Sequence, residues 1–500
     1  MNIKNWFKSA RTPTVKNLKS GIKKHRDRRL QIPWNFAQLG MLIFPLIPIL
    51  GALGIFLGLA GTSKHKFREI CRRPVNQGFA LLSILLVITA IFANNRIEAF
   101  IGLFNFLPFF IFFVVFSSLI QTPAQLRQLS WAIVISSIPV IILGLGQQFL
   151  GWSGIDLLQP VFGWVLEPKG NPPGRMASVF MYANILACYL TIAFILALGL
   201  WMGEVSWQLS PIPNSRCPMP NAQFPITNAR CPMPNSQFLF LTLVVVGNAV
   251  CLIFTNSRNA WGLAVLASVA FAVYAGWKKL LAGVFSAVGT VFLSAFGPPP
   301  VRQYLRTIIP AFFWARLTDE MFPNRPTATL RTTQWQFAWS MTQQRPWTGW
   351  GLRNFTPLYE AQMHEWLGHP HSLILMLTAE TGIPITLFFL GLVGWILARG
   401  VLLLMNWRSH FPVDTQQQEI EENAISNITN RVICQDVNSG DRLIFFSYLL
   451  AFAACTLFNT VDVTLFDLRL NTISWLLLAA ISGVSEALVS LSRKEARQGF

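Results

Sequence analysis

The chain has few charged residues: only 12% of its 500 residues are Asp, Glu, Lys or Arg. A soluble globular domain carries about 25%, so this composition excludes an ordinary soluble protein. Hydrophobic residues make up 53%, including 41 Phe and 18 Trp, and the mean hydropathy is +0.47. Most of the chain must therefore face lipid or other helices, which predicts an all-α protein that crosses a membrane many times.

Paired cysteines are also missing. The seven cysteines are scattered, and none forms a Cys-x-x-Cys pair with a matching histidine pair, so we expect neither a structural zinc site nor a disulfide framework. The first 31 residues have no apolar core, so we expect no cleavable signal peptide there.

Acidic residues are scarce relative to basic ones, and the net charge is +18. In a soluble protein this excess would suggest a nucleic-acid partner. Here the basic residues lie mainly between apolar runs, so they indicate orientation in a membrane and no nucleic acid. Residues 1–31 are expected to form a basic cytoplasmic tail; the alternative is an arm that binds anionic lipid or RNA.

Eleven runs are long and apolar enough to cross a membrane. They are 36–61, 77–93, 99–120, 131–150, 178–201, 238–255, 259–276, 280–297, 373–405, 443–459 and 470–490. The predicted organisation has five parts. They are the tail 1–31, an N-terminal transmembrane bundle over 32–297, a large Arg-rich loop over 298–372, C-terminal transmembrane helices over 373–490 and a cytoplasmic tail over 491–500.

Basic residues in short loops set the expected orientation. The loop 62–76 contains five of them, which predicts that it is cytoplasmic and that 151–177 and 298–372 lie outside. An odd number of spans would then put the basic N-terminus outside as well. The segment 36–61 contains Pro45, Pro48, Gly51, Gly54 and Gly58, so we expect a tight pair of short helices there, twelve membrane segments and an inside N-terminus.

Two connections are expected to be solvated cytoplasmic loops, and the first of them, 202–237, is expected to be flexible and without catalytic role. Within 202–237, the stretch 214–224 recurs almost unchanged at 228–238, and two such copies are too few to build a stacked repeat. Within 406–442, the stretch 414–441 is polar and acidic, which favours disorder.

Arginine replaces lysine throughout the loop 298–372. The seven arginines are Arg302, Arg306, Arg316, Arg325, Arg331, Arg345 and Arg353. The planar fork of arginine binds anions in a bidentate way that lysine cannot match, so we expect the set to bind an anionic ligand. The alternative is that single arginines pair with lipid phosphates or with Asp319, Glu320, Glu360 and Glu365.

The same loop ends in Gly368-His369-Pro370-His371-Ser372, where the chain enters the next apolar run. A histidine there can take a proton from a hydroxyl, which makes His371 a candidate base. The alternative is an interfacial histidine that caps a helix or meets headgroups. A metal site at His369 and His371 has no obvious third ligand in the sequence, so no metal is expected.

Further polar residues fall on the same face. Arg258 lies in the turn Thr255–Trp261, where it either lines a cavity facing His371 or reaches lipid headgroups. Arg175 leads into a run with Tyr182 and Asn184.

The last turn between apolar runs contains Asp462, Asp467, Arg469 and Asn471. Two aspartates and one arginine either form a closed salt bridge or hold the arginines of the site in position.

These motifs, in this order, resemble the O-antigen ligase and polymerase superfamily of bacterial envelope enzymes. The family's ligases carry His-[Asn/Ser/Gln]-x9-Gly where the large loop returns to the membrane. His371-Ser372 and Gly382 fit this pattern, although Ile385 departs at its last position. Ser257-Arg258-Asn259-Ala260-Trp261 is similar to the family's Ser-Arg-Gly-Ala-Trp turn, with Asn259 for glycine.

Two more segments carry the resemblance. Arg331 and Trp335, followed by Pro346-Trp-Thr-Gly349-Trp-Gly351, look like the family's loop segment, and Arg175 to Asn184 looks like its Gly-Arg…Asn-x-Leu-Ala segment. The matched order covers roughly 170–390.

The resemblance implies a metal-independent membrane glycosyltransferase, similar in layout to C-type enzymes that use lipid-linked sugars. The implied donor is an undecaprenyl-diphosphate-linked glycan, and the acceptor hydroxyl belongs to lipid A-core or a similar lipid or glycan. No cofactor is implied. The implied location is the bacterial inner membrane, with the active face in the periplasm.

The resemblance also suggests roles for the candidate residues. His371 and Arg258 would be catalytic, and Arg175, Arg258, Arg331 and Arg353 would bind the diphosphate, whose growing charge fixed arginines stabilise. The supporting set would be His369, Glu380, Asn184, Asp462, Asp467 and Arg469.

Two other functions stay open at this point. A polymerase that joins repeat units would use the same site with a second lipid-linked glycan as acceptor. An anion transporter, for example of bicarbonate, would use the outward arginines to gather anions, but it needs a site near the membrane midplane. Glu380 and Gly382 mark a candidate break inside 373–405 that such a site could use.

Overall fold

The computed structural model describes residues 25, 27–154, 162–209, 236–318, 320, 326–407 and 424–498. Within these ranges the regular structure is helical, with no strand. The first copy of the repeat at 214–224 and nearly all of the basic tail 1–31 lie outside the described residues. So do most of the second copy and the side chains of Asp319, Arg316 and Arg325.

Ten described segments are long and apolar enough to cross a membrane. They are α5 (Pro74–Ile91), the segment Arg96–Leu119 formed by α6 (Arg96–Gly102), η2 (Leu103–Asn105) and α7 (Leu107–Leu119), then α8 (Pro123–Phe149), α10 (Ala183–Leu209), α11 (Ser236–Phe254), α12 (Arg258–Ala275), α13 (Lys278–Phe296), α19 (Ile383–Met405), α20 (Ala424–Val461) and α21 (Leu468–Gln498). The prediction of an all-α polytopic membrane protein is confirmed.

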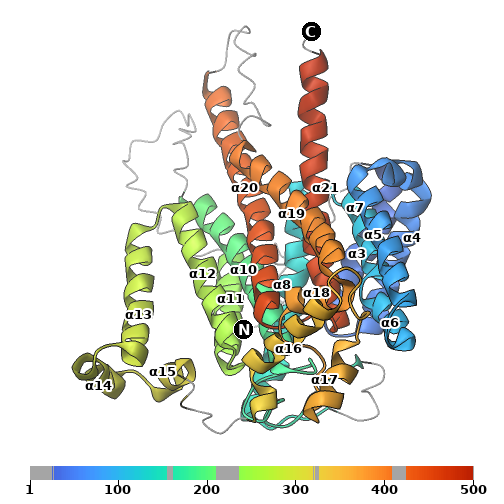
Figure 1. The fold of residues 1–500 in the computed structure, drawn as a ribbon. Coiled ribbons are helices and arrows are strands. Elements are labelled where there is room, and N and C mark those ends of the chain that lie inside the picture. Colours follow the sequence, from blue (N-terminus) through green and yellow to red (C-terminus); the bar gives the residue numbers. More distant parts are fainter. Residues whose placement is uncertain are drawn as a thin grey trace, which may run out of the picture.

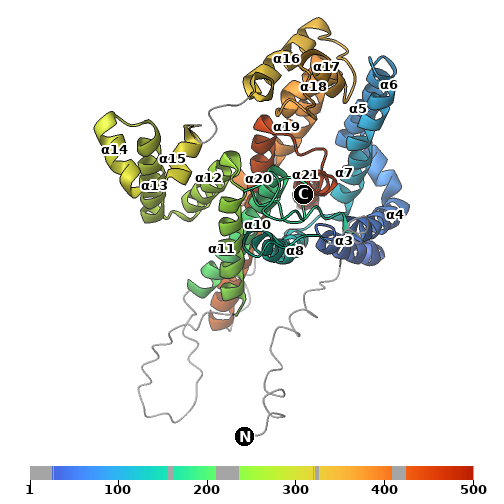
Figure 2. The ribbon, with the colours of Figure 1, turned by 90° about the horizontal axis from the view of Figure 1, so that it is seen from below.

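Five shorter helices gather at one end of the bundle, which we call the loop end (bottom of Figure 1; Figure 2 views the molecule from that side). They are α14 (Pro299–Ile308), α15 (Ala311–Leu317), α16 (Arg331–Gln344), α17 (Phe355–Met363) and α18 (Leu373–Thr381). The loop expected over 298–372 is therefore largely helical. The opposite end, toward which the C-terminus of α21 points in Figure 1, is called the basic end.

The segment 36–61 is a helical hairpin, as expected for a tight pair. Helix α3 (Gln31–Ile43) packs along α4 (Pro48–Arg72), and the backbones approach so closely that a Cβ on Gly40 would lie 2.7 Å from the Ile55 nitrogen. A Cβ on Gly51 would lie 2.4 Å from Cα of Phe44. Small residues permit such contact between helices in membranes, which explains the glycines of this run.

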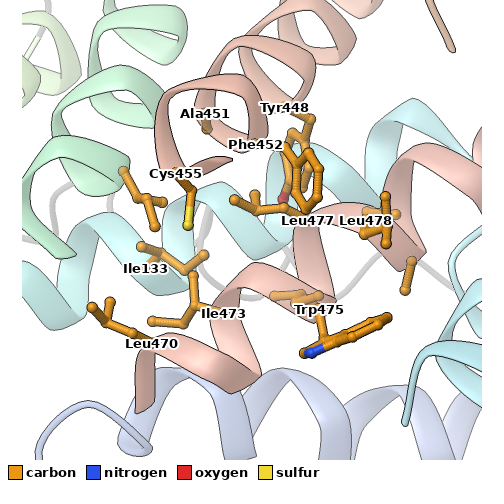
Figure 3. Close-up of a cluster of buried hydrophobic side chains, with 14 of the residues drawn as sticks. Ile133, Tyr448, Ala451, Phe452, Cys455, Leu470, Ile473, Trp475, Leu477 and Leu478 are labelled. Carbon is orange, nitrogen blue, oxygen red and sulfur yellow. The ribbon is translucent and has the colours of Figure 1, made fainter. Parts of the chain in front are cut away.

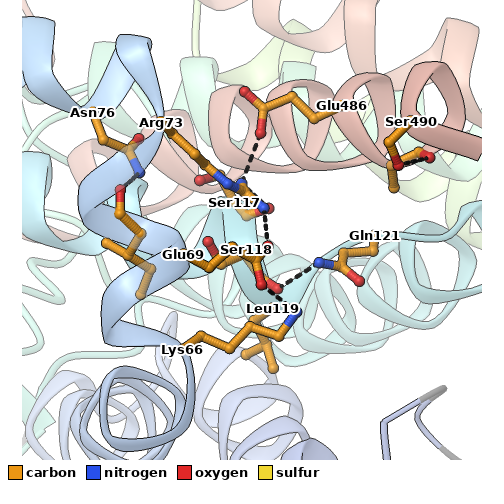
Figure 4. A network of polar contacts seen from close by, with 12 residues as sticks. Lys66, Glu69, Arg73, Asn76, Ser117, Ser118, Leu119, Gln121, Glu486 and Ser490 are labelled. Carbon is orange, nitrogen blue, oxygen red and sulfur yellow. Dashed lines mark hydrogen bonds and ion pairs between the residues drawn. The ribbon is translucent and has the colours of Figure 1, made fainter. Parts of the chain in front are cut away.

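Polar contacts place both described ends of the chain at the basic end. Arg73 forms ion pairs with Glu69 (2.7 Å) and Glu486 (2.8 Å) and donates to the Ser117 carbonyl, so the ends of α4, α7 and α21 meet there (Figure 4). Nε2 of His25 lies 3.1 Å from the carbonyl oxygen of Leu119.

The α3–α4 turn lies at the other end, because Nε1 of Trp164 donates to the Leu46 carbonyl and the neighbouring Gly163 accepts from Arg469. The hairpin and the ten spans give twelve segments with both ends on one side, which removes the conflict over the N-terminus.

The most buried helices lie at the centre of the bundle. Within the span windows, 83% of α10 and 78% of α21 are buried, against 11% of α13 and 17% of α19. Apolar side chains of α20 and α21 pack together around Cys455, Leu477 and Trp475 (Figure 3). A residue at the end of α10 or α21 therefore stands on a rigid support.

Two predicted segments differ from the structure. The run 373–405 is two helices, α18 and α19, separated by Gly382 at φ +82°, so the candidate break is present. The stretch 414–441, expected to be disordered, is helical from Ala424 onward because α20 continues the last-but-one span.

Candidate active site

The segment before His371 is supported by a small core of its own at the loop end. Phe337 of α16, Phe355 and Tyr359 of α17 and Ala379 of α18 pack together, and the three aromatic rings lie 5.0–5.7 Å apart. This packing ties α18, which begins two residues after His371, to the rest of the loop.

A strap of backbone hydrogen bonds joins the segment Pro346–Gly351 to the end of α18. Trp350 and Gly351 donate to the carbonyls of Ala379 and Glu380 (3.0 and 2.8 Å), and Ile383 donates to the Pro346 carbonyl (2.8 Å).

Two glycines make this contact possible, Gly349 at φ +65° and Gly382 at φ +82°. A Cβ on Gly382 would lie 2.6 Å from the Trp347 oxygen, and one on Gly349 would lie 2.4 Å from the Glu380 carbonyl. The glycines of two separate motifs are therefore required by the same contact.

His371 faces a carboxylate from the turn between α20 and α21. Its Nδ1 lies 3.0 Å from Oδ1 of Asp462, which also accepts from the Val463 backbone. His371 itself has φ +51°, a strained conformation for a residue with a side chain. The two residues are 91 positions apart in sequence, so this pairing could not be read from spacing.

Asp462 is ionised in this setting. Its burial alone would raise the pKa, but the hydrogen bond and charge of His371, with weaker help from His369 and Val463, hold the pKa of Asp462 below its usual range. A carboxylate can only accept, so Nδ1 of His371 must be the donor. The lone pair of a neutral imidazole is then on Nε2.

His369 lies against both partners. Its Nε2 is 4.0 Å from Oδ1 of Asp462, its ring centroid is 4.6 Å from that of His371, and its Nδ1 accepts from the His371 backbone nitrogen at 3.2 Å. The other face stacks on Phe466 at 5.8 Å. Burial, and next the neighbouring His371, lower the pKa of His369 to about 4, so it is neutral at pH 7.

A chain of hydrogen bonds connects Asp462 to an arginine. Nδ2 of Asn184, at the start of α10, donates to Oδ2 of Asp462 at 2.6 Å. Arg175 donates through Nη2 to Oδ1 of Asn184 and through Nε to the Thr255 carbonyl at 2.9 Å. The carboxylate and the guanidinium are thus held by one amide, which orients both.

The segment that follows Arg175 is held in place by hydrogen bonds to Gln147. The sequence had not indicated a role for this residue. Oε1 of Gln147 accepts from the backbone of Ala177 and Ser178, and its Nε2 donates to the Glu167 carbonyl at 2.8 Å. Gln147 is fully buried. A glutamine at the end of an otherwise apolar run was the available signal.

Three predicted arginines come within electrostatic range of one another. Burial lowers the pKa of Arg175, and Arg331 and Arg258 lower it further by repulsion, while Tyr182 and Asp462 act against this. Arg331 also lowers the pKa of His369. Arg258 and Arg331 are the first residues of α12 and α16, so helix N-termini add positive potential near these side chains.

Three other arginines of the loop have local partners. Arg306 pairs with Glu320 at 3.0 Å and stacks on Trp314, and Arg345 stacks on Trp350 at 4.0 Å. Arg353 pairs with Glu98 at 3.0 Å, beside α6. The Arg306–Glu320 pair is one of the alternative pairings considered from the sequence, whereas Trp350 and Glu98 were not among the expected partners. The ion pair directs Arg353 toward Glu98.

Asp467 and Arg469 stabilise the turn before α21. Oδ1 of Asp467 accepts from the backbone of Arg469 and Leu470, which is a helix cap. Arg469 is 6% exposed and donates to the carbonyls of Val179 and Gly163. The first alternative from the sequence, a closed salt bridge of both aspartates with Arg469, is absent from the described ion pairs, because Asp462 faces His371 instead.

Glu380 lies under the strap rather than beside His371. It is 2% exposed, and Oε1 accepts from the Phe355 backbone at 3.3 Å. Its contacts therefore connect α18 to α17.

Backbone strain is concentrated at the loop end. The described non-glycine residues with positive φ are Lys169, Ser178, Asn256, Arg353, His364 and His371, and all lie in loop-end segments. Such strain persists only where the surroundings enforce it, and it clusters at functional sites.

An apolar cavity opens next to the histidines. Its volume is about 110 Å³, and it is lined by residues of α18, α19, α20 and α21, among them Leu373, Phe389 and Trp475. Leu373 is two residues from His371, and the lining residue Thr464 is two residues from Asp462. The lining of the cavity thus begins within two residues of His371 and of Asp462 and extends between the spanning helices.

A family model described as O-antigen ligase matches residues 243–390. This match, over part of the chain, supports its place in the O-antigen ligase superfamily. No curated protein matches the chain.

The match contains Arg258, Arg331, His369 and His371, whereas Arg175, Asn184 and Asp462 lie outside it. The match supports a glycosyltransferase-like membrane enzyme of the ligase or polymerase type. For such an enzyme the family implies a lipid-linked glycan donor and a glycan or lipid acceptor.

Proposed function

We propose that the chain transfers a glycan from undecaprenyl diphosphate to an acceptor hydroxyl, as an O-antigen ligase does, with lipid A-core or a similar molecule as acceptor. The observation that carries this proposal is the hydrogen bond between Nδ1 of His371 and Asp462, within reach of Arg175 through Asn184. It combines an oriented base and a cationic group at one end of a membrane bundle.

His371 is the general base in this scheme. The acceptor oxygen attacks the anomeric carbon, and its proton passes to Nε2 of His371 while Asp462 stabilises the imidazolium that forms. This division of roles is the same in other histidine–aspartate pairs. His369 remains neutral and buttresses the ring through its contact with the His371 backbone.

The arginines act on the leaving group. As the bond from the anomeric carbon to the diphosphate oxygen breaks, negative charge grows on the diphosphate, and Arg175, Arg258 and Arg331 stabilise it. Arg353, which pairs with Glu98, contributes only if that ion pair opens. Asn184 couples the two halves because it binds both Arg175 and Asp462.

The isoprenoid tail of the donor has an apolar place to lie. The cavity of about 110 Å³ beside Leu373 continues from the polar cluster toward the helices and is large enough for part of such a chain. The diphosphate would then remain at the loop end, which we place in the periplasm at the surface of the bacterial inner membrane.

The scheme needs no metal ion or other cofactor. Proton removal and charge stabilisation are both supplied by side chains of the chain itself, namely His371, Asp462 and the arginines.

Comparing lipopolysaccharide ladders from a strain that lacks this chain tests the proposal. A ligase predicts intact core without attached chains, restored by the wild-type protein. Core that carries a single repeat unit would instead identify a polymerase that uses the same site. An unchanged ladder would contradict both, and altered anion uptake in that strain would point to a transporter.

A further inference from the structure

The cluster of His369, His371 and Asp462 has a second chemical property. Each of the three residues offers one metal-ligand atom, and these atoms all lie within 4.8 Å of one another. Ligands of a tetrahedral Zn²⁺ at bond lengths of about 2.0–2.2 Å stand roughly 3–3.5 Å apart. The observed separations of 3.0 Å and 4.0 Å to Oδ1 of Asp462 bracket this range.

Hydrogen bonds from neighbouring groups orient the side chains of the cluster. Asn184 donates to Oδ2 of Asp462, which leaves Oδ1 directed at the histidines. Nδ1 of His369 accepts from the His371 backbone, so the N–H of this neutral ring is on Nε2, 4.0 Å from Oδ1 of Asp462. A metal ion on Nε2 therefore requires that proton to move to Nδ1 through solvent, which breaks the hydrogen bond from the His371 backbone. The third ligand, Asp462, is far from the histidine pair in sequence and is brought to it by the fold.

We propose that a zinc-class transition-metal ion binds to His369, His371 and Asp462 and inhibits the enzyme. The binding itself is independent of the proposed function, but the inhibition rests on the role of His371 as base.

The ligand set selects the class of metal. Two imidazole nitrogens and one carboxylate oxygen suit Zn²⁺ and Co²⁺, whereas Mg²⁺ and Ca²⁺ prefer oxygen ligands. The nearby arginines repel any cation, so an ion that depends on charge attraction alone gains little here. Only an ion that forms strong bonds to imidazole nitrogen overcomes this repulsion.

Inhibition follows from the proton count of a neutral imidazole, which has a single N–H. Without metal, that proton is on Nδ1 of His371, facing Asp462, and Nε2 can accept a proton from the acceptor hydroxyl. When a metal takes Nδ1, the proton moves through solvent to Nε2. The nitrogen that faced the hydroxyl then becomes a donor, and the base is lost with no change in imidazole charge.

Metal binding is measured first, on the purified full chain without substrate. Co²⁺ absorption and Zn²⁺ retained in equilibrium dialysis should both report one more ion bound by wild type than by His369→Ala. His369→Gln is a second variant in case the first is unstable. The matched control is His364→Ala, an exposed histidine of the same loop, which should bind as wild type does. Equal binding by wild type and both His369 variants overturns the metal site.

Inhibition is measured next, with each protein's transfer rate divided by its own zinc-free rate. Zn²⁺ should lower wild-type transfer, a chelator should restore it, and Mg²⁺ at the same concentration should have no effect. His369→Gln removes a ligand, so it should need at least about 10–100-fold more Zn²⁺ for the same loss, because the loss of a residue that only supports a ligand already costs that much affinity.

The outcomes separate the two ideas. If zinc binds at these residues but transfer is unchanged or faster, the inhibition and the base at Nε2 of His371 are both wrong, although the metal site stands. If zinc does not bind there, the metal proposal fails and the proposed transfer reaction is untouched.

Discussion

At the residue scale, one contact decides which nitrogen of His371 can act as a base. The Asp462 carboxylate accepts from Nδ1 at 3.0 Å, so the lone pair is on Nε2. Asn184 and the Val463 backbone occupy the other acceptor positions of the same carboxylate. Asp462 therefore cannot turn away from His371 without breaking several bonds.

Asp462→Asn should lower the transfer rate by a factor on the order of 10³–10⁴, as expected when a base is held in the wrong tautomer. The NH₂ of the new amide would face either His371 and the Val463 N–H, or the NH₂ of Asn184, so at least one hydrogen bond is lost in each orientation. The measurement is transfer by purified protein at saturating donor. Asp441→Asn changes an aspartate that pairs with Arg127 near the start of the spanning part of α20, Ser439–Val461. This variant should retain near-wild-type transfer; an equal loss in both variants would refute the assignment.

His369 should make the protein sensitive to acid. Its pKa falls from 6.5 in the unfolded chain to about 4 in the folded one, so below pH 6.5 the unfolded state binds more protons. Stability should therefore fall as the pH drops from about 6.5 to 4, by roughly 3 kcal/mol at most. The melting temperature, measured across this pH window, should fall less steeply for His369→Gln than for the wild-type protein. Parallel pH profiles for the two proteins would argue against a buried neutral histidine.

At the scale of elements, the site is held by short segments between the spans. The strap Pro346–Gly351 bonds to the end of α18, and His371 lies at the other end of this helix. A substitution that displaces the strap should therefore also displace His371, because the nine residues of α18 connect the two.

Gly382→Ala should destabilise the protein by on the order of 2–4 kcal/mol, because φ is +82° and the added Cβ would lie 2.6 Å from the Trp347 oxygen. Both transfer and the melting temperature should fall. Gly391→Ala is the matched control: it lies inside α19 with nothing within 4 Å of the added atom, and helical Gly→Ala is neutral or stabilising. A normal melting temperature for Gly382→Ala would show that the strap is not tight.

Most elements followed from the sequence because apolar length alone determines a spanning helix. The break at Gly382 followed from a glycine inside a long apolar run. The helices α16 and α17 could not be predicted from apolar length. They are short, and their apolar residues pack into a small core that forms only in the folded protein. The Asp462 pairing was likewise hidden, since it joins two turns 91 residues apart.

At the scale of the whole molecule, the α3–α4 hairpin determines the topology. It crosses toward the loop end and returns, so His25 and the end of α21 lie at the same end as Arg73. When 36–61 is counted as a single apolar run, the whole chain has an odd number of spans. Apolar length cannot reveal the hairpin, because the close contacts at its glycines form only in the folded protein.

Single-cysteine labelling should confirm this topology. Cys71, which is exposed, and Ser490→Cys lie at the basic end and should resist an impermeant thiol reagent in intact cells. Trp366→Cys, at a side chain 70% exposed at the loop end, should react. Each variant is placed in a background without other cysteines, and all three should react after lysis. Labelling of Cys71 and Trp366→Cys from the same side would contradict twelve segments.

The central claim is that His371 removes the proton of the acceptor hydroxyl, and the most direct measurement is transfer by His371→Ala. The variant protein, in membranes and at wild-type abundance, is given the lipid-linked donor and the acceptor, and product formation is followed. The account predicts no detectable transfer while the protein stays folded and inserted. Transfer at the wild-type rate would contradict it.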